Sequence, residues 1–171
     1  TADLINLQAF TTVGQALSGL GKPSARGKER ADSHIDVTPE RDRERISYVS
    51  EGEWLAKSKA PTSIKGKLSA KDTTKYLRLS RKKPSNTLRC GEIFFHPSQD
   101  RYLTPREYLR LHGYPDEYLL TGPIRSRSGS VKDLDQHRQV ANSVPPPLAA
   151  VIGFAVISAL CQKSRKPTVK G

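Results

Sequence analysis

The apolar stretch at residues 148–160 constrains the fold of this chain more than any other feature. It follows three prolines, which suit the first turn of a helix because an N–H there has no helical partner. Apolar residues lie on nearly every side of the expected helix, residues 145–161, so it needs burial on several sides. Only 35% of the 171 residues are hydrophobic, too few to surround it. We therefore expect a second protein body to cover this helix.

The same stretch bears on membrane association. A helix needs about 20 apolar residues to cross a bilayer, and residues 148–161 are fewer. No signal peptide opens the chain, and no basic amphipathic stripe is evident. We therefore expect no membrane partner.

A second helix is strongly delimited. Thr104 suits its N-cap, Pro105 its first position, and Glu107 stands where it can reach back to the cap. Gly113 can end the helix in a left-handed conformation, and Pro115 prevents it from resuming. The pattern predicts a short helix over residues 105–112.

The residues of this segment resemble the ninth motif of the DNA (cytosine-5) methyltransferases. That motif reads Arg-x-Leu-Thr-x-Arg-Glu-x-x-Arg-Leu, followed by Gly-Tyr/Phe-Pro-Asp. The matching positions here are Arg101, Leu103, Thr104, Arg106, Glu107, Arg110, Leu111, Gly113, Tyr114, Pro115 and Asp116.

Residues 139–149, Gln-Val-Ala-Asn-Ser-Val-Pro-Pro-Pro-Leu-Ala, resemble the tenth motif of the same family. The order and spacing of the two motifs also fit. Ala141 departs from the pattern, because the family usually has Gly there.

The resemblance implies a mixed α+β fold. We expect a β-rich target-recognition domain at residues 1–118, which includes the ninth motif, and then a variable linker at residues 119–138. Residues 139–162 would hold the tenth motif and the helix that completes a Rossmann-like catalytic domain. A basic tail would follow at residues 163–171.

Charge indicates the partner. The net charge is +12, and residues 57–89 hold eleven basic residues against one acidic residue. Such an excess favours a polyanion. A solubilising loop is the alternative, but we favour a DNA-backbone groove, because strand-like segments at residues 76–79 and 92–95 accompany the charges. Residues 45–49 also have the composition of a short strand, after a loop at residues 21–45.

Residues 84–88, Pro-Ser-Asn-Thr-Leu, resemble a target-recognition element in which a Thr contacts the phosphate of the everted cytosine. The resemblance assigns that contact to Thr87, whose hydroxyl is a compact donor. Arg78, Arg81 and Arg89 are candidates to read bases, because arginine makes bidentate contacts to guanine. Lys82 and Lys83 complete the expected double-stranded DNA contacts.

The family's reaction needs groups that this sequence lacks. Its nucleophile lies in Pro-Cys-Gln, its acid in Glu-Asn-Val and its cofactor loop in Phe-x-Gly-x-Gly, and none of these occurs here. We therefore expect no catalytic residue in this chain. Cys90 would be a recognition-loop or packing residue and Cys161 inert core. Their spacing indicates neither a disulfide framework nor a metal site.

Other roles follow from the resemblance alone. It implies that Asn142, Ser143 and Val144 close on the methionine end of S-adenosylmethionine. It also implies a structural role for Arg101, Arg106 and Glu107, which would hold the recognition domain together.

Two function classes stay open. The chain is either the recognition part of a cytosine-5 methyltransferase, inactive without a partner that carries the first to eighth motifs, or a stand-alone DNA-binding module. It has no Met, even at position 1, so we expect a processed or excised piece rather than a whole reading frame. Two origins fit the resemblance: the smaller subunit of a naturally split methyltransferase, or an excised domain of a single-chain enzyme. We expect a bacterial cytoplasmic, nucleoid-associated location.

Overall fold

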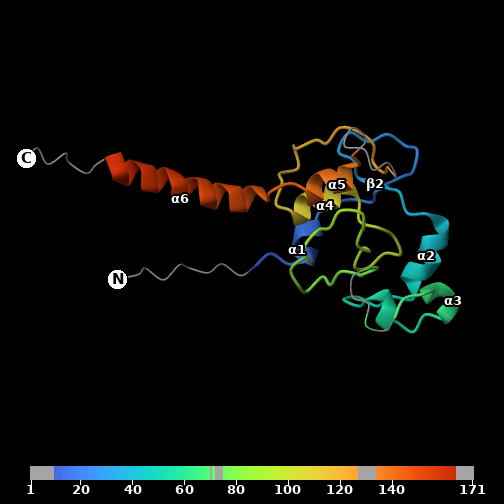
Figure 1. The fold of residues 1–171 in the computed structure, drawn as a ribbon. Coiled ribbons are helices and arrows are strands. Elements are labelled where there is room, and N and C mark those ends of the chain that lie inside the picture. The colour runs from blue at the N-terminus through green and yellow to red at the C-terminus, as the bar shows by residue number, and fades with distance from the viewer. Residues whose placement is uncertain (1–9, 70, 72–74, 127–133, 165–171) are drawn as a thin grey trace, which may run out of the picture.

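The computed structural model describes residues 10–69, 71, 75–126 and 134–164. Small helices and irregular chain form a body, and the last helix, α6, projects from it (Figure 1). The elements in chain order are α1 (Val13–Leu17), β1 (Ser24–Ala25), β2 (Ile35–Asp36), α2 (Glu40–Ser47), the 3-10 helix η1 (Leu55–Lys57), α3 (Thr62–Lys65), α4 (Pro105–Leu111), α5 (Gln136–Ala141) and α6 (Pro146–Ser164).

Regular β-structure is sparser than the sequence predicts. Among the described residues, the only sheet is the parallel pair β1 and β2. The segments expected as strands, residues 76–79 and 92–95, are joined through the single bridge between Arg78 and Phe95. Each segment also pairs with a different neighbour, through Trp54–Leu77 and Phe95–Tyr102. The expectation of a β-rich domain was therefore wrong, because isolated bridges do not extend into ladders.

The strand expected at residues 45–49 was also wrong. Helix α2 occupies most of that segment and begins after Pro39, with two acidic residues in its first turn and Arg45 in its last. These charges suit the helix dipole. Ile46 and Val49 are buried beside Phe95, so their apolar side chains serve the core from a helix and the turn that follows it.

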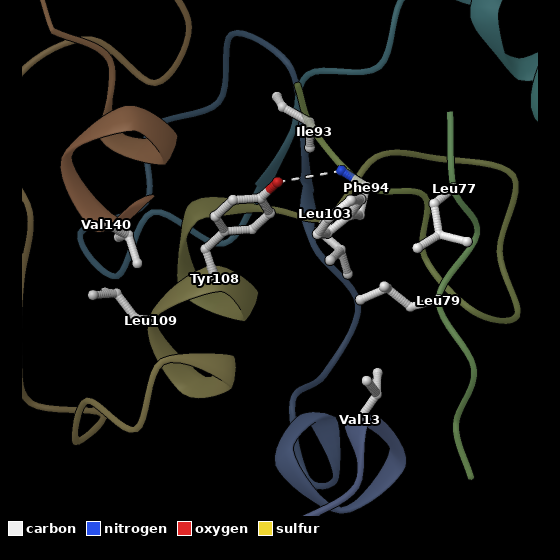
Figure 2. Close-up of a cluster of buried hydrophobic side chains, with 9 residues drawn as sticks. All are labelled: Val13, Leu77, Leu79, Ile93, Phe94, Leu103, Tyr108, Leu109 and Val140. Carbon is white, nitrogen blue, oxygen red and sulfur yellow. Dashed lines mark hydrogen bonds between the residues drawn. The ribbon is translucent and has the colours of Figure 1, made fainter. Parts of the chain in front are cut away.

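The main core joins segments that are distant in sequence. It consists of Val13, Leu77, Leu79, Ile93, Phe94, Leu103, Tyr108, Leu109 and Val140. Figure 2 shows side chains from α1, α4 and α5 that converge on the extended segments. The Tyr108 hydroxyl accepts a hydrogen bond from the Phe94 N–H at 3.2 Å, which satisfies a buried polar group inside this cluster.

The helix predicted from the ninth-motif segment is confirmed as α4. Its capping box is complete: Glu107 N–H donates to Thr104 Oγ1 at 3.3 Å, and Thr104 N–H donates to Glu107 Oε2 at 2.8 Å. Gly113 follows the helix with a φ of 83°, as the left-handed termination requires. The capping box at Thr12 and Gln15, at the start of α1, is complete as well.

The segment expected as a linker, residues 119–138, includes the start of a helix. Helix α5 begins at Gln136, and Asp135, Gln136 and His137 are buried. The Asp135 side chain caps α5 by accepting the Arg138 N–H at 3.0 Å. Residues 127–133 of the linker and residues 165–171 of the tail lie outside the described residues, as do residues 1–9.

Helix α6 projects from the body (Figure 1), and most of its residues from 147 to 162 are exposed. Seven of its large hydrophobic side chains are more than half exposed: Leu148, Val151, Ile152, Phe154, Val156, Ile157 and Leu160. Cys161 is exposed too, which corrects its expected place in a core.

The length argument against a membrane span does not hold. Helix α6 has 19 residues. The segment Gln136–Gln162, which comprises α5, the turn after it and most of α6, is long and apolar enough to cross a bilayer, by length and composition only.

Candidate functional site

The loop that carries Thr87 is anchored to α1. Val13 N–H donates to Lys83 O at 2.9 Å, and Gly14 N–H donates to Arg81 O at 3.0 Å. A side chain at position 14 would place its Cβ 2.9 Å from Arg81 O, so the close approach requires glycine. Thr87 itself is exposed, while the neighbouring Leu88 packs against the main core. The loop therefore presents Thr87 outward from a fixed base.

The tenth-motif residues form the end of α5 and the turn to α6. Asn142 is the C-cap of α5 and is exposed. The Ser143 hydroxyl donates to Val140 O at 2.7 Å, which ties the turn to the helix. Val144 is 58% exposed.

These two segments meet in the folded chain. The Cys90 thiol, just after the Thr87 loop, donates a hydrogen bond to Asn142 Oδ1 at 2.7 Å. Fifty-two positions separate the two residues. Sequence reasoning named both but found no link between them, because no local pattern connects them.

His137 fixes α5 against α4. Its ring lies edge-on to Tyr108, with centroids 4.9 Å apart, and its Nε2 lies 2.8 Å from Leu103 O. Burial lowers the pKa of His137 to about 4, so the ring is neutral at neutral pH, and its Nδ1 lies 3.3 Å from Ile124 O. The tenth-motif segment thereby rests on the ninth.

The charged residues of the ninth motif are internal. Arg101 and Glu107 form a buried ion pair, and His96 lies 3.7 Å from the same carboxylate. Burial alone would raise the pKa of Glu107, but the hydrogen bonds and the charge of Arg101, together with the Thr104 N–H, outweigh it and hold that pKa below its ordinary value. Arg106 is buried and donates to Asp32 O and Tyr118 O at 2.9 and 2.8 Å. These contacts join the ninth motif to chain segments on both sides of it.

A pocket of about 570 Å3 opens between α2 and residues 89–93. Two carboxylates and six cationic side chains line it, the cations being Arg26, Arg41, Arg45, Lys75, Arg89 and Arg125. Four of the six lie outside the basic segment at residues 57–89. Sequence reasoning missed these four because they come from separate segments, none of them strongly basic alone.

Comparison with known proteins identifies the family. The sequence matches the C-5 cytosine-specific DNA methylase family over residues 20–158. The chain belongs to this family. The result confirms the family expected from the ninth and tenth motifs.

Three curated relatives of this methylase chain, two from plants and one from a mammal, illustrate the similarity. DNA (cytosine-5)-methyltransferase CMT1 of Oryza sativa subsp. japonica is 34% identical over 131 residues, 73% of this chain. DNA (cytosine-5)-methyltransferase 1 of Rattus norvegicus is 44% identical over 79 residues, 44% of this chain. DNA (cytosine-5)-methyltransferase 3 of Arabidopsis thaliana is 46% identical over 66 residues, 39% of this chain. The matches cover only 11%, 4% and 4% of these relatives.

In the methylase structure, some residues expected to bind DNA are exposed and one is internal. Arg78 is buried, pairs with Asp100 and donates to Ile46 O at 2.7 Å. This fixed internal position argues against its expected role as a base reader. Arg81 is exposed and pairs with Glu51 at 2.9 Å. Lys82, Lys83 and Arg89 are exposed, and Arg89 lines the pocket.

Members of this family use S-adenosylmethionine as methyl donor, and the tenth-motif residues fit one edge of a site for it. The exposed Asn142 carboxamide keeps its N–H donors while its oxygen accepts from Cys90. Such donors suit the carboxylate of the cofactor's methionine end, and exposed Val144 offers an apolar neighbour.

Proposed function

We propose that this chain is the target-recognition and cofactor-pocket-completing part of a sequence-specific DNA cytosine-5 methyltransferase. The complete enzyme would transfer the S-adenosylmethionine methyl group to C5 of a cytosine flipped out of double-stranded DNA. The supporting observation is the hydrogen bond between Cys90 and Asn142, which joins the end of the Thr87 loop to the tenth motif. One rigid unit would then present both the DNA contact and the cofactor contact.

The chemistry requires a partner. Methylation at C5 needs a thiolate that attacks C6, and this sequence has no Pro-Cys-Gln segment. We propose that a protein part with the first to eighth motifs supplies the nucleophile, as a separate subunit or in a longer chain. The 171-residue chain alone would bind DNA without methylating it.

Helix α6 supports the same proposal. Val151 and Phe154 are 67% and 73% exposed, and each large apolar side chain that a partner covers contributes about 1.5–3 kcal/mol. The helix leaves the turn that holds Asn142, so its partner must lie beside the proposed cofactor edge. A catalytic domain satisfies that condition, whereas a bilayer would place the cofactor edge at its surface.

Reconstitution tests the proposal. The chain is mixed with the catalytic part, and methyl transfer from labelled S-adenosylmethionine to duplex DNA is measured together with co-purification. We expect activity only in the mixture. Val151→Asp with Phe154→Asp should abolish assembly and leave DNA binding intact, while the control Gln162→Asp, at an exposed polar position, should not.

Three outcomes would contradict the proposal. Methyl transfer by the chain alone would place the nucleophile within it. Monomeric behaviour with α6 protected in hydrogen exchange would favour the stand-alone DNA-binding module. Binding of α6 to lipid vesicles in preference to the catalytic part would favour a membrane span. The bacterial cytoplasmic location stays a prediction.

A further inference from the structure

The cationic pocket between α2 and residues 89–93 is lined by less exposed side chains, here called its floor, and by exposed side chains, here called its rim. Asp42 is buried in the floor, where its Oδ1 accepts from Arg45 at 2.9 Å and its Oδ2 accepts from the Tyr102 hydroxyl at 2.7 Å. Burial and the neighbouring Asp42 raise the pKa of Tyr102, so its hydroxyl stays protonated and donates. The Asp42 carboxylate is therefore already bound by two donors of the protein, Arg45 and Tyr102.

One wall is stiffened by an aromatic contact. The Arg45 guanidinium lies 5.0 Å from the centre of the Tyr76 ring, which also lies against Phe95 at 6.1 Å. Tyr76 has a φ of 61°, a conformation that costs a bulky residue energy. Glu92 accepts the Tyr76 backbone N–H and so helps to hold that conformation. Arg45 is consequently part of the wall.

The rim carries the charge that remains for a ligand. Arg26, Arg41 and Arg125 come from three different segments and are all exposed. Arg41 lies 3.9 Å from the Asp42 carboxylate, whose oxygens already accept closer donors. A ligand that spans this rim must offer several separated negative charges.

The pocket adjoins the Thr87 loop. Arg89 and Cys90 line its wall and lie two and three positions after Thr87. An anionic strand that reaches Thr87 can therefore continue into the pocket. A phosphodiester backbone has this form, with one negative charge at each nucleotide.

We infer that this pocket holds the sugar–phosphate backbone of the bound DNA, with Arg26, Arg41 and Arg125 as phosphate contacts. The inference rests on the proposed function and adds to it residues outside the basic segment at residues 57–89. Contacts to phosphates fix the position of DNA and carry no sequence information directly, so these three arginines would position the DNA.

The test compares two variants of the 171-residue chain with equal loss of charge. The pocket variant carries Arg41→Ala and Arg125→Ala. The control variant carries Lys22→Ala and Lys28→Ala, two exposed lysines that lie outside both the pocket and the basic segment at residues 57–89. Affinity for two fluorescent DNA duplexes of unrelated sequence is measured at several salt concentrations.

We expect the pocket variant to weaken binding to both duplexes equally. The slope of log affinity against log salt should fall by about 0.9 for each lost phosphate contact, or about 1.8 in total. The control variant should change the slope by much less, because its lysines lie outside the pocket.

Contrary results separate the two proposals. Equal slope changes in both variants would overturn the pocket assignment while DNA binding stands, since only net charge would then matter. A loss confined to one duplex would overturn it in favour of base reading. Failure of the unmodified chain to bind either duplex would overturn the pocket assignment and the proposed function together.

Discussion

The Arg101 guanidinium meets the Glu107 carboxylate through two hydrogen bonds, 2.8 and 2.7 Å long, in the interior of the body. Both side chains are almost fully buried, at 5% and 2% exposure. Glu107 Oε2 also accepts the Thr104 N–H, so one carboxylate caps α4 and neutralises a buried cation.

Glu107→Ala should therefore destabilise the chain strongly. Removal of one partner leaves a buried charge uncompensated, which typically costs about 3–5 kcal/mol. Urea unfolding followed by circular dichroism would measure this loss in the free energy of unfolding. Arg81→Ala, which breaks the exposed pair with Glu51, should leave the unfolding free energy nearly unchanged. Similar losses in both variants would contradict a special role for the internal pair.

Stability should fall as the pH drops from about 6.5 to about 4. Burial lowers the pKa of His137 from 6.5 to about 4, so in this window the unfolded chain binds a proton that the folded chain rejects. The contribution of the neutral His137 ring to the free energy of unfolding is fully present above pH 6.5 and is lost as the pH falls towards 4. His96, whose pKa is also about 4 because of burial, acts in the same direction.

Urea unfolding at pH 7, 6 and 5 would test this window. His137→Gln removes one titrating group. It should reduce the slope of the unfolding free energy against pH by up to about 1.4 kcal/mol per pH unit. An unchanged slope would show that His137 does not titrate with folding.

Gly113→Ala should cost more stability than Gly27→Ala. The two glycines have nearly equal φ values, 83° and 85°, so both substitutions incur about 1–2 kcal/mol of backbone strain. A Cβ at position 113 would also lie 2.8 Å from Pro147 Cγ, whereas nothing lies within 4 Å at position 27. Overpacking of this kind typically adds about 1–3 kcal/mol. If thermal unfolding shows the same loss of stability in both variants, a tight contact at the start of α6 is excluded.

Asn142→Ala should weaken S-adenosylmethionine binding in the reconstituted enzyme. Loss of a hydrogen bond to a charged group costs about 1.5–3 kcal/mol, or about 10- to 150-fold in affinity. Calorimetric titration would measure it. Asn86→Ala, at an exposed asparagine of the Thr87 loop, is the matched control and should retain the affinity. Unaltered binding by Asn142→Ala would refute the cofactor role.

Thr87→Ala should reduce single-turnover methylation more than DNA affinity, because one phosphate contact among several is lost. Thr87→Ser keeps the hydroxyl and should retain most of the rate. Equal rates for all three forms would remove Thr87 from the reaction.

Local features were predictable from the sequence. The start of α4 at Thr104 and its end at Gly113 depend on residues within one or two helical turns, and so does the capping box of α1. The two motifs also led to the correct family. The apolar character of α6 was evident as well, because it depends on composition alone.

The remaining features depend on contacts between distant residues. Ile46 favours a strand by its branched side chain, but its burial beside Phe95 is achieved from α2. The hydrogen bond from Cys90 to Asn142 and the cationic pocket join segments that no spacing rule relates. The sequence by itself determined the caps, the motifs and the exposed apolar helix. Only the tertiary structure decided which charges became internal, as Arg78 did, and which line an exposed pocket, as Arg41 did. Burial and proximity of this kind arise only when distant segments pack together.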